Sequence, residues 1–220
     1  MTLKYRTISD YVLDYLRTNI LNGKFKPGDA IDQNIISDEI KVSRTPIKTS
    51  LHELEAEGLV VLKPHATAIV APLLAEGAEE LYLMRYGLEE AVAVLGAEKI
   101  DENGLEKMAD CLAKIDEIVK NGSDEAILTY FKTDKEFHRI HYLAAGKPRL
   151  WDRINDLKDK CQRYTRYFWH DHNSYVITAD THYKVLEACK KHDGMEAGKY
   201  IKIGLELTLQ CLIKSINGNK

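Results

Sequence analysis

The chain has 220 residues, 45% of them hydrophobic and 30% charged, with a formal net charge of −3. This composition is that of an ordinary globular protein, long enough for one large domain or two modest ones with cores of their own. No apolar run is long enough to cross a bilayer, and residues 1–10 lack a signal-peptide pattern, so we expect a cytoplasmic protein without a membrane partner. The four cysteines match no zinc-knuckle spacing, which favours reduced thiols.

The net charge argues against a nucleic-acid partner, but the distribution of charge does not. Residues 1–72 contain nine basic and nine acidic side chains, so the rest of the chain carries the whole acidic excess. Between Lys41 and Lys48 there are three basic residues and no acidic one. A local positive patch is sufficient for a surface that binds DNA.

The first part of the chain predicts two helices before a longer amphipathic segment. Residues 8–20 place apolar side chains at helical spacing, and this helix is expected to end at the Gly- and Pro-containing turn of residues 22–31. A short helix follows over residues 32–40, with Asp32 as its candidate N-cap.

The segment 42–60 predicts a third helix with one buried face. Ile47, Leu51 and Leu54 follow the spacing of a single helix face, which favours packing on a core, and Gly58 predicts the end of the helix.

The beginning of this third helix is basic and rich in hydroxyl groups. Ser43 or Thr45 can cap it, and Pro46 is tolerated in a first turn. Arg44 and Lys48 lie one turn apart and can both point outward. Such a helix start suits phosphate groups, although an ordinary surface helix with a basic first turn is the alternative.

Two short β-branched runs follow, over residues 59–64 and 67–73, and predict a hairpin. Two short helices joined by a tight turn, with the second basic at its start, form a helix-turn-helix, and the hairpin makes it a winged one. We therefore expect a winged helix-turn-helix domain over residues 1–72.

The remainder, residues 73–220, predicts an all-α bundle without a convincing strand. The expected helices cover residues 74–98, 101–121, 124–145, 149–172, 176–192 and 194–216. The predicted fold class is thus mainly α, with a winged helix-turn-helix followed by an all-α helical bundle.

Several segments resemble a known family of bacterial transcription regulators. The first domain is similar to the winged helix-turn-helix of the GntR family in "ILNGKFKPGDAI", "VSRTPIK", "LHELEAEGLV" and "IVAPL". The bundle resembles the FCD effector domain of the FadR subgroup in "LYLMRYGLEEAVAVLGAEKI", "TDKEFHRIHYLAAGKPRLWD" and "THYKVLEACKKHDGMEAGKYI". Six helices place it nearer the shorter, VanR-like form of that domain.

The resemblance implies which residues contact DNA, because the second helix of the motif lies in the major groove in this family. The residues carried over by position are Ser43, Arg44, Thr45 and Lys48. An arginine here can make a bidentate contact to guanine, whereas the hydroxyl groups suit phosphate.

Two candidate DNA contacts depart from the family pattern. Lys41 stands in the turn before the recognition helix, where the family usually has glycine. His65 precedes Ala66 and Thr67 at the wing tip, where the family usually ends in Arg-Gly.

The resemblance also implies a metal site, because many FCD domains hold a divalent ion such as zinc, nickel or manganese with one aspartate and three histidines. The matching residues here are Asp134, His138 and His182, and the position of the remaining histidine is Gly204. The alternative is that Asp134 and His138, four residues apart on a helix, form a hydrogen-bonded pair without a metal.

The effector implied by this site is a small anion of the carboxylate type. Arg85 is a candidate clamp, because a guanidinium can bind a carboxylate in a bidentate manner, although a buried pair with Glu89 on the same helix is the alternative. Arg163 and Arg166 are further candidates for lining the effector pocket.

The favoured hypothesis is a ligand-responsive regulator, not an enzyme, that binds a pseudo-palindromic operator in double-stranded DNA as a homodimer. One alternative is a metal-dependent enzyme on the helical domain, with the winged helix as an accessory. Another is a regulator that has lost its small-molecule site.

Overall fold

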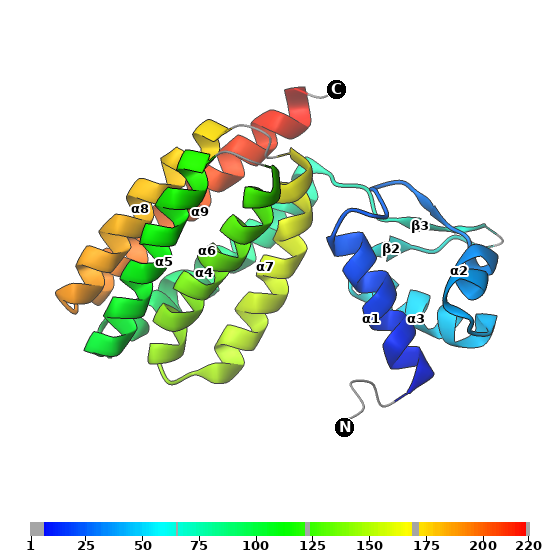
Figure 1. Ribbon diagram of the computed structural model, residues 1–220, viewed down its shortest axis with the longest axis horizontal. Helices are drawn as coiled ribbons and strands as arrows, with labels where there is room; N and C mark the ends of the chain where they lie inside the picture. The colour runs from blue at the N-terminus through cyan, green and yellow to red at the C-terminus, as the bar shows by residue number, and fades with distance from the viewer. Residues whose placement is uncertain (1–6, 65, 122–123, 169–171, 219–220) are drawn as a thin grey trace. The chain divides into compact units, whose positions relative to one another are not determined.

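The computed structural model describes residues 7–64, 66–121, 124–168 and 172–218 (Figure 1). The chain divides into two compact units, Met1–Leu74 and Ala75–Lys220. The first unit is a winged helix-turn-helix and the second a helical bundle, which confirms the predicted fold class.

Three helices and a small antiparallel sheet make up the described part of the first unit. β3 lies between the other two strands, with Ile31 paired to Ala68 on one side and Val60 paired to Val70 on the other. The elements are α1 (Ile8–Leu21), β1 (Ala30–Ile31), α2 (Gln33–Ile40), α3 (Arg44–Ala56), β2 (Val60–Val61) and β3 (Ala68–Val70). The hairpin of β2 and β3 was predicted from the sequence, but the two-residue strand β1 was not.

The ends of these helices are set by local hydrogen bonds. At the start of α1, Thr7 accepts a hydrogen bond from the backbone of Asp10, whose carboxylate accepts one from the backbone of Thr7, which is a complete capping box. Asp32 caps α2 as predicted. α3 ends in a Schellman motif, in which Gly58 has a φ of 73° and the Leu59 N–H reaches the carbonyl of Leu54.

One apolar cluster is the core of the first unit. It gathers side chains from all three helices and from the sheet, so α3 cannot move without disturbing the others. Its most buried members are Val12, Leu16, Ile31, Ile36, Ile47, Leu51, Leu54, Val60 and Val70.

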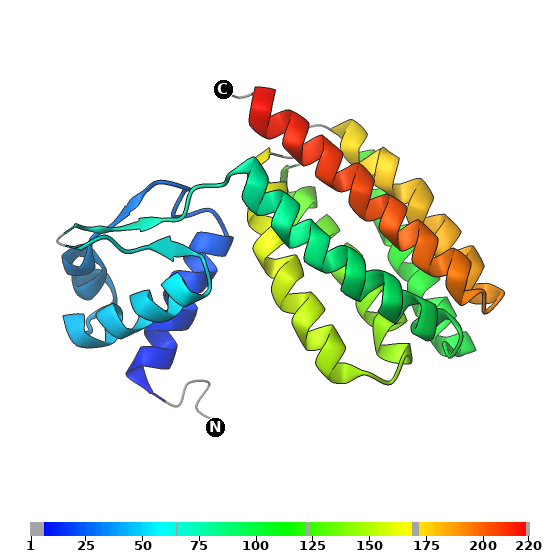
Figure 2. The same cartoon turned by 180° about the vertical axis from the view of Figure 1, so that it is seen from behind.

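Six helices make up the second unit over the residues that the structure describes. α4 packs against α6, α7 and α9, and α5 packs against α6 and α8; Figure 2 shows α4 and α9 side by side along the bundle. The helices are α4 (Ala75–Ala97), α5 (Glu102–Asn121), α6 (Asp124–Ala144), α7 (Pro148–Phe168), α8 (His172–Lys190) and α9 (Gly194–Gly218).

The predicted helices of the bundle are confirmed, with one boundary displaced. α8 begins at His172, which the sequence had assigned to the end of the preceding helix. Aromatic and polar residues alternate across this region, and such a pattern suits the end of one buried helix as well as the start of the next. None of the helices described is long and apolar enough to cross a membrane.

Candidate DNA-binding surface and metal and effector site

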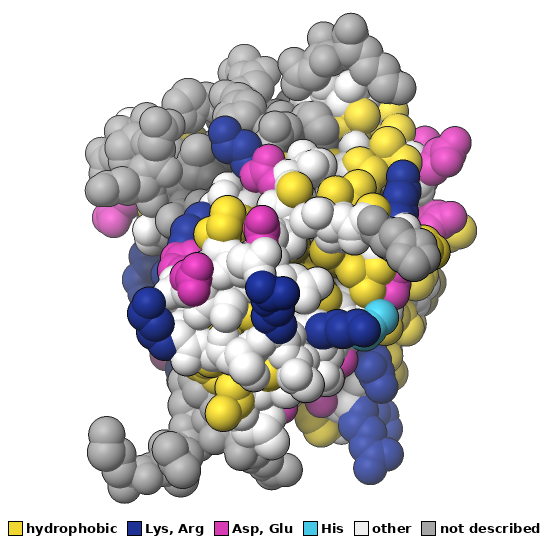
Figure 3. All heavy atoms as spheres, turned by 90° about the vertical axis from the view of Figure 1, so that its right-hand side faces the viewer, with side chains coloured by type: hydrophobic (Ala, Val, Ile, Leu, Met, Phe, Trp, Pro, Cys, Tyr) yellow, Lys and Arg dark blue, Asp and Glu magenta, His cyan; other side chains and the backbone are white. Residues whose placement is uncertain are grey.

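The start of α3 and the end of α2 carry the side chains that the sequence proposes for DNA. All five of those described, Lys41, Ser43, Arg44, Thr45 and Lys48, are exposed. They surround a helix N-terminus, whose first backbone N–H groups have no partner within the helix and favour anions. Figure 3 looks onto the first unit and shows Lys and Arg side chains among uncharged surface and several Asp and Glu side chains.

The opposite face of α3 fixes the helix to the rest of the unit. Ile47, Leu51 and Leu54 are buried in the core, as predicted. The hydroxyl group of Ser50 is fully buried and lies 2.9 Å from the backbone carbonyl of Pro46 and 3.0 Å from that of Ser9, and the second contact links α3 to the start of α1. The exposed face is therefore presented on a rigid support.

Ser43 occupies the N-cap position of α3, but its side chain makes no capping hydrogen bond. The hydroxyl group is thus not used to close the helix. A shallow hollow on the first unit is bordered by Arg44 from α3, Asn34 from α2 and Thr67 from the wing. His65, the proposed contact at the wing tip, lies outside the described residues.

Lys41 ends α2 in the left-handed conformation, with a φ of 55° and a ψ of 45°. This conformation explains why glycine is usual at this position in the family that the sequence resembles. The lysine therefore adds a charge at the edge of the surface at a conformational cost.

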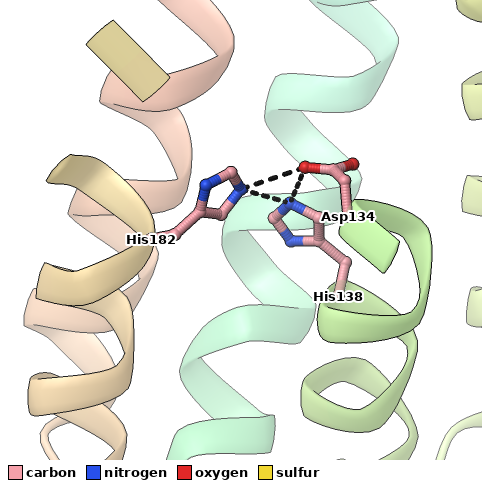
Figure 4. Close-up of side chains that lie close together, drawn as sticks. All are labelled: Asp134, His138 and His182. Atoms are coloured by element: carbon pink, nitrogen blue, oxygen red, sulfur yellow. Dashed lines mark hydrogen bonds and ion pairs between the residues drawn. The ribbon is translucent and has the colours of Figure 1, made fainter. Parts of the chain in front are cut away.

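In the second unit, Asp134 and His138 from α6 meet His182 from α8 (Figure 4). The Oδ1 atom of Asp134 lies 3.1 Å from Nε2 of His182 and 3.6 Å from Nε2 of His138, and the two Nε2 atoms are 3.2 Å apart. The structure thus brings together the three residues that the sequence proposed as metal ligands.

These distances fit a shared divalent ion. A triangle with sides of 3.1, 3.6 and 3.2 Å has a point roughly 2 Å from each corner, which is the usual length of zinc–nitrogen and zinc–oxygen bonds. Both rings can act as ligands through Nε2 when each carries its proton on Nδ1, because the two facing nitrogens then present lone pairs to the ion. The set supplies three protein ligands, as open zinc sites do.

Burial and neighbouring charge keep His138 and Asp134 in the protonation states that ligands need. Burial and the ammonium group of Lys158 lower the pKa of His138 to about 4, so its ring is neutral near pH 7. Burial opposes the charge of Asp134, but Lys158 and the two histidines hold the pKa of this carboxyl well below its usual value. Asp134 is consequently ionised.

Gly204 on α9 faces the same cavity, which is where the family pattern expects a histidine. A Cβ atom at this position would lie 2.9 Å from Oγ1 of Thr181, the residue before His182. Position 204 therefore points towards the site, but the hydroxyl group of Thr181 occupies the space next to it.

Arg85 forms the buried pair with Glu89 that the sequence gave as the alternative to an effector clamp. Its Nε atom donates to Oε1 of Glu89 at 2.5 Å, and both side chains are buried. The other carboxylate oxygen of Glu89 accepts a hydrogen bond from the hydroxyl group of Tyr142 at 2.8 Å. Arg85 nevertheless lines the cavity, with its guanidinium group over the ring of Tyr82.

The prediction that Arg163 lines the effector pocket is corrected. This side chain is buried, but it is not among the described residues that line the cavity. The cavity receives Lys158, Cys161 and Thr165 from α7, and the helical rotation turns Arg163 away from that face. The side chain of Arg166 lies outside the described residues.

The cavity, of about 100 Å³, also contains groups that the sequence did not reveal. The Nζ atom of Lys158 lies 3.4 Å from Oδ2 of Asp134. The hydroxyl group of Tyr82 is buried without a hydrogen-bond partner among the described residues. The sequence positions of Lys158 and Tyr82 do not indicate that they lie near Asp134. Only the packing of α4, α6 and α7 brings them to the same cavity.

Two family models match the chain. The one described as "FCD domain" covers residues 80–205, and the one described as "Bacterial regulatory proteins, gntR family" covers residues 8–70. The chain belongs to the GntR family and carries an FCD domain.

Curated relatives of this GntR-family chain are named as transcription regulators. It is 26% identical to an uncharacterized HTH-type transcriptional regulator of Bacillus subtilis, YdhC, over 84% of this chain and 82% of the relative. It is 30% identical to the regulator LutR of the same species, over 68% of this chain and 75% of the relative. It is 24% identical to the transcriptional repressor RspR of Escherichia coli, over 85% and 81%.

Solved structures of GntR-type proteins share the fold. McbR/YncC of E. coli superposes with a TM-score of 0.77 at 18% identity, over 96% of this chain and 99% of the other. A putative GntR regulator from Rhodococcus sp. RHA1 superposes with a TM-score of 0.74 at 21% identity, over 94% and 97%. Together with the family matches, these relatives identify a DNA-binding transcription regulator.

Proposed function

We propose that this regulator binds a pseudo-palindromic operator as a homodimer, with the start of α3 from each protomer in a major groove. The exposed, basic start of α3 supports this proposal, because its opposite face is fixed in the core. Arg44 reads a base, whereas Lys41 and Lys48 contact the phosphate backbone together with the hydroxyl groups of Ser43 and Thr45.

Replacement of Arg44 by alanine tests the base contact. Arg44→Ala should weaken binding to the cognate operator by about 1–3 kcal/mol and relax base preference at one position of each half-site. Arg153→Ala is the matched control, because it removes an exposed arginine from the second unit. Equal affinities of the wild type and the Arg44 variant, measured by fluorescence anisotropy at fixed salt, would contradict the assignment.

The homodimer is tested by the mass of the protein in solution. Two-fold proteins match the two-fold symmetry of palindromic sites, so sedimentation should give twice the chain mass of 25.1 kDa. A monomer that binds a complete operator tightly at micromolar concentration would be inconsistent with this part of the proposal.

We further propose that a small carboxylate, bound in the cavity of the second unit, changes operator affinity. The observation that carries this proposal is the convergence of Asp134, His138 and His182 at the wall of a cavity that also receives Arg85. A divalent ion held by the three residues would supply a positive centre for the effector. The effector alters DNA binding by favouring one arrangement of the two DNA-binding units.

Elemental analysis of wild-type protein and of Asp134→Asn tests the metal site. The wild type should retain metal weakly, and the variant should retain none, because one of only three ligands is no longer a carboxylate. Asp159→Asn is the control, because Asp159 lines the same cavity but is paired with Lys135 at 2.6 Å. Equal metal contents in the wild type and the Asp134 variant would refute the ligand assignment.

Restoring the expected histidine gives a second test of the same site. The double variant Gly204→His, Thr181→Ala should bind metal more tightly than the wild type, because it adds a donor and removes the hydroxyl group that crowds position 204. Gly204→His alone should show a smaller gain. A melting temperature of the double variant that does not respond to chelator would exclude position 204 as a ligand position.

The alternative of a metal-dependent enzyme has no comparable support. The relatives are named as transcription regulators, and an enzyme on the helical domain leaves the winged helix-turn-helix domain unexplained. The regulatory function uses both units of the chain.

A further inference from the structure

The carboxylate of Asp134 has two different partners. Its Oδ1 atom faces the two histidine rings, at 3.1 and 3.6 Å, whereas its Oδ2 atom lies 3.4 Å from the ammonium group of Lys158. Only 9% of the Lys158 side chain is exposed, so water screens this charge poorly. The ammonium group therefore lies against the ligand set that would hold the ion.

The charges around the cavity are already balanced without a metal. Asp134 lies opposite Lys158, and Asp159 is paired with Lys135 at 2.6 Å. The buried Arg85 is paired with Glu89, also on α4, at 2.5 Å. A divalent ion beside Asp134 would add two positive charges to a site with one ammonium group in contact. Like charges in a poorly hydrated site repel strongly.

The ligand set itself is too small to offset this repulsion. Gly204 provides no donor atom where the family pattern expects an imidazole, so the described set contains one carboxylate and two imidazole rings. An ion in this site would have open positions for an additional ligand. An anionic ligand would fill such a position and also reduce the excess positive charge.

We propose, building on the function proposed above, that this chain binds its divalent ion and its carboxylate effector as a pair. Lys158 disfavours the ion alone, and a small carboxylate that contacts both the ion and the Lys158 ammonium group makes the two bind cooperatively. The cavity, of about 100 Å³, has room for a small carboxylate. Because coupling is reciprocal, the metal must raise the affinity for carboxylate by the same factor.

The pairing is tested by calorimetric titration of the tag-free full-length protein with zinc, in the absence and presence of acetate, which has the required charge and size. In the wild type, acetate should raise the association constant for zinc by about tenfold, within the usual range of coupling between sites. In Lys158→Met, zinc alone should bind about tenfold more tightly than in the wild type, and acetate should change its affinity less than about threefold.

Three further variants test whether the effect comes from the contact of Lys158 with Asp134, from the net charge of the protein, or from misfolding of the methionine variant. Lys132→Met removes an exposed lysine two residues before Asp134 and should behave as the wild type. Lys158→Arg keeps the charge and should retain the coupling. Lys158→Gln keeps a polar side chain beside Asp134 and should lose the coupling, and its helical content can be checked by circular dichroism if the methionine variant does not fold.

The possible failures distinguish the two proposals. Zinc that binds the wild type with the same affinity with and without acetate overturns the pairing but leaves the metal site intact. Coupling that persists in the folded Lys158→Met or Lys158→Gln variant overturns the role of Lys158. Absence of zinc binding under every condition, with acetate included, overturns the proposed metal site and the pairing with it.

Discussion

The left-handed conformation of Lys41 predicts that stability and DNA affinity can be changed separately at this position. A side chain with a Cβ atom loses about 1–2 kcal/mol in this conformation, and glycine does not. Glycine in turn destabilises the folded state by about 0.5–1 kcal/mol, because it increases the conformational freedom of the unfolded chain. With a φ of 55°, Lys41→Gly should therefore be more stable than Lys41→Ala by about 0.5–1 kcal/mol.

Comparison with alanine isolates the backbone effect, because both variants remove the same charge. Their operator affinities should fall equally, and the slope of log K against log salt should become shallower by about 0.9 for each phosphate that the protein no longer neutralises. Lys41→Gly should bind DNA more weakly than the wild type. It should also be more stable than the wild type if the relieved strain exceeds the free-energy cost of removing the charge at the end of α2.

Urea unfolding followed by two signals measures the stability of the two units. Far-ultraviolet circular dichroism reports on all helices, whereas both tryptophans, at positions 151 and 169, belong to the second unit. Tryptophan fluorescence is thus an internal control that should not change. Equal stability of the glycine and alanine variants would refute the strain at Lys41, and a difference in their DNA affinities would refute a purely electrostatic role.

Three further outcomes are expected. Thr7→Ala should cost about 1 kcal/mol of unfolding free energy because it breaks a capping box, whereas Ser43→Ala should cost little because its side chain makes no capping bond, and urea unfolding compares them. Tyr82→Phe removes a buried hydroxyl group without a partner among the described residues, so its melting temperature should stay equal or rise, and a fall would reveal a hydrogen bond to that hydroxyl group. Burial lowers the pKa of His141 to about 3, below its unfolded value near 6.5, so between these pH values only the unfolded chain binds a proton on this ring. The free energy of unfolding should therefore fall by about 1.4 kcal/mol per pH unit as the pH drops through this window. The fall should be less steep in His141→Gln. An unchanged pH profile in that variant would contradict the assignment.

Local sequence rules were sufficient for most of the fold. Gly58 has the positive φ that its position after an apolar helix face predicted, and Asp32 caps α2. Both signals act within a few residues, so they can be interpreted without knowing the tertiary structure. The strand β1 was missed because two residues contain no periodicity, and its existence depends on pairing with β3, which lies far along the chain.

The candidate site was only partly predictable, for a related reason. Asp134 and His138 share one helix face, so their spacing of four indicated a common partner. His182 lies 44 residues after His138, and only resemblance to a family connected the two. Lys158 has neither kind of signal, because the side of α7 that faces the cavity is decided by how the helix packs against its neighbours.

The effect of glycine at position 204 depends on the residues around it. In the sequence, Gly204 is a missing ligand and predicts a weaker metal site. In the structure, Thr181 fills the adjacent space and Lys158 supplies a positive charge on the other side of Asp134. Under the pairing proposed above, the absence of a donor and the presence of an ammonium group both weaken binding of the ion when no anion is bound, and a bound carboxylate relieves both. On that proposal, the same residues that weaken a permanent metal site make metal binding responsive to an effector.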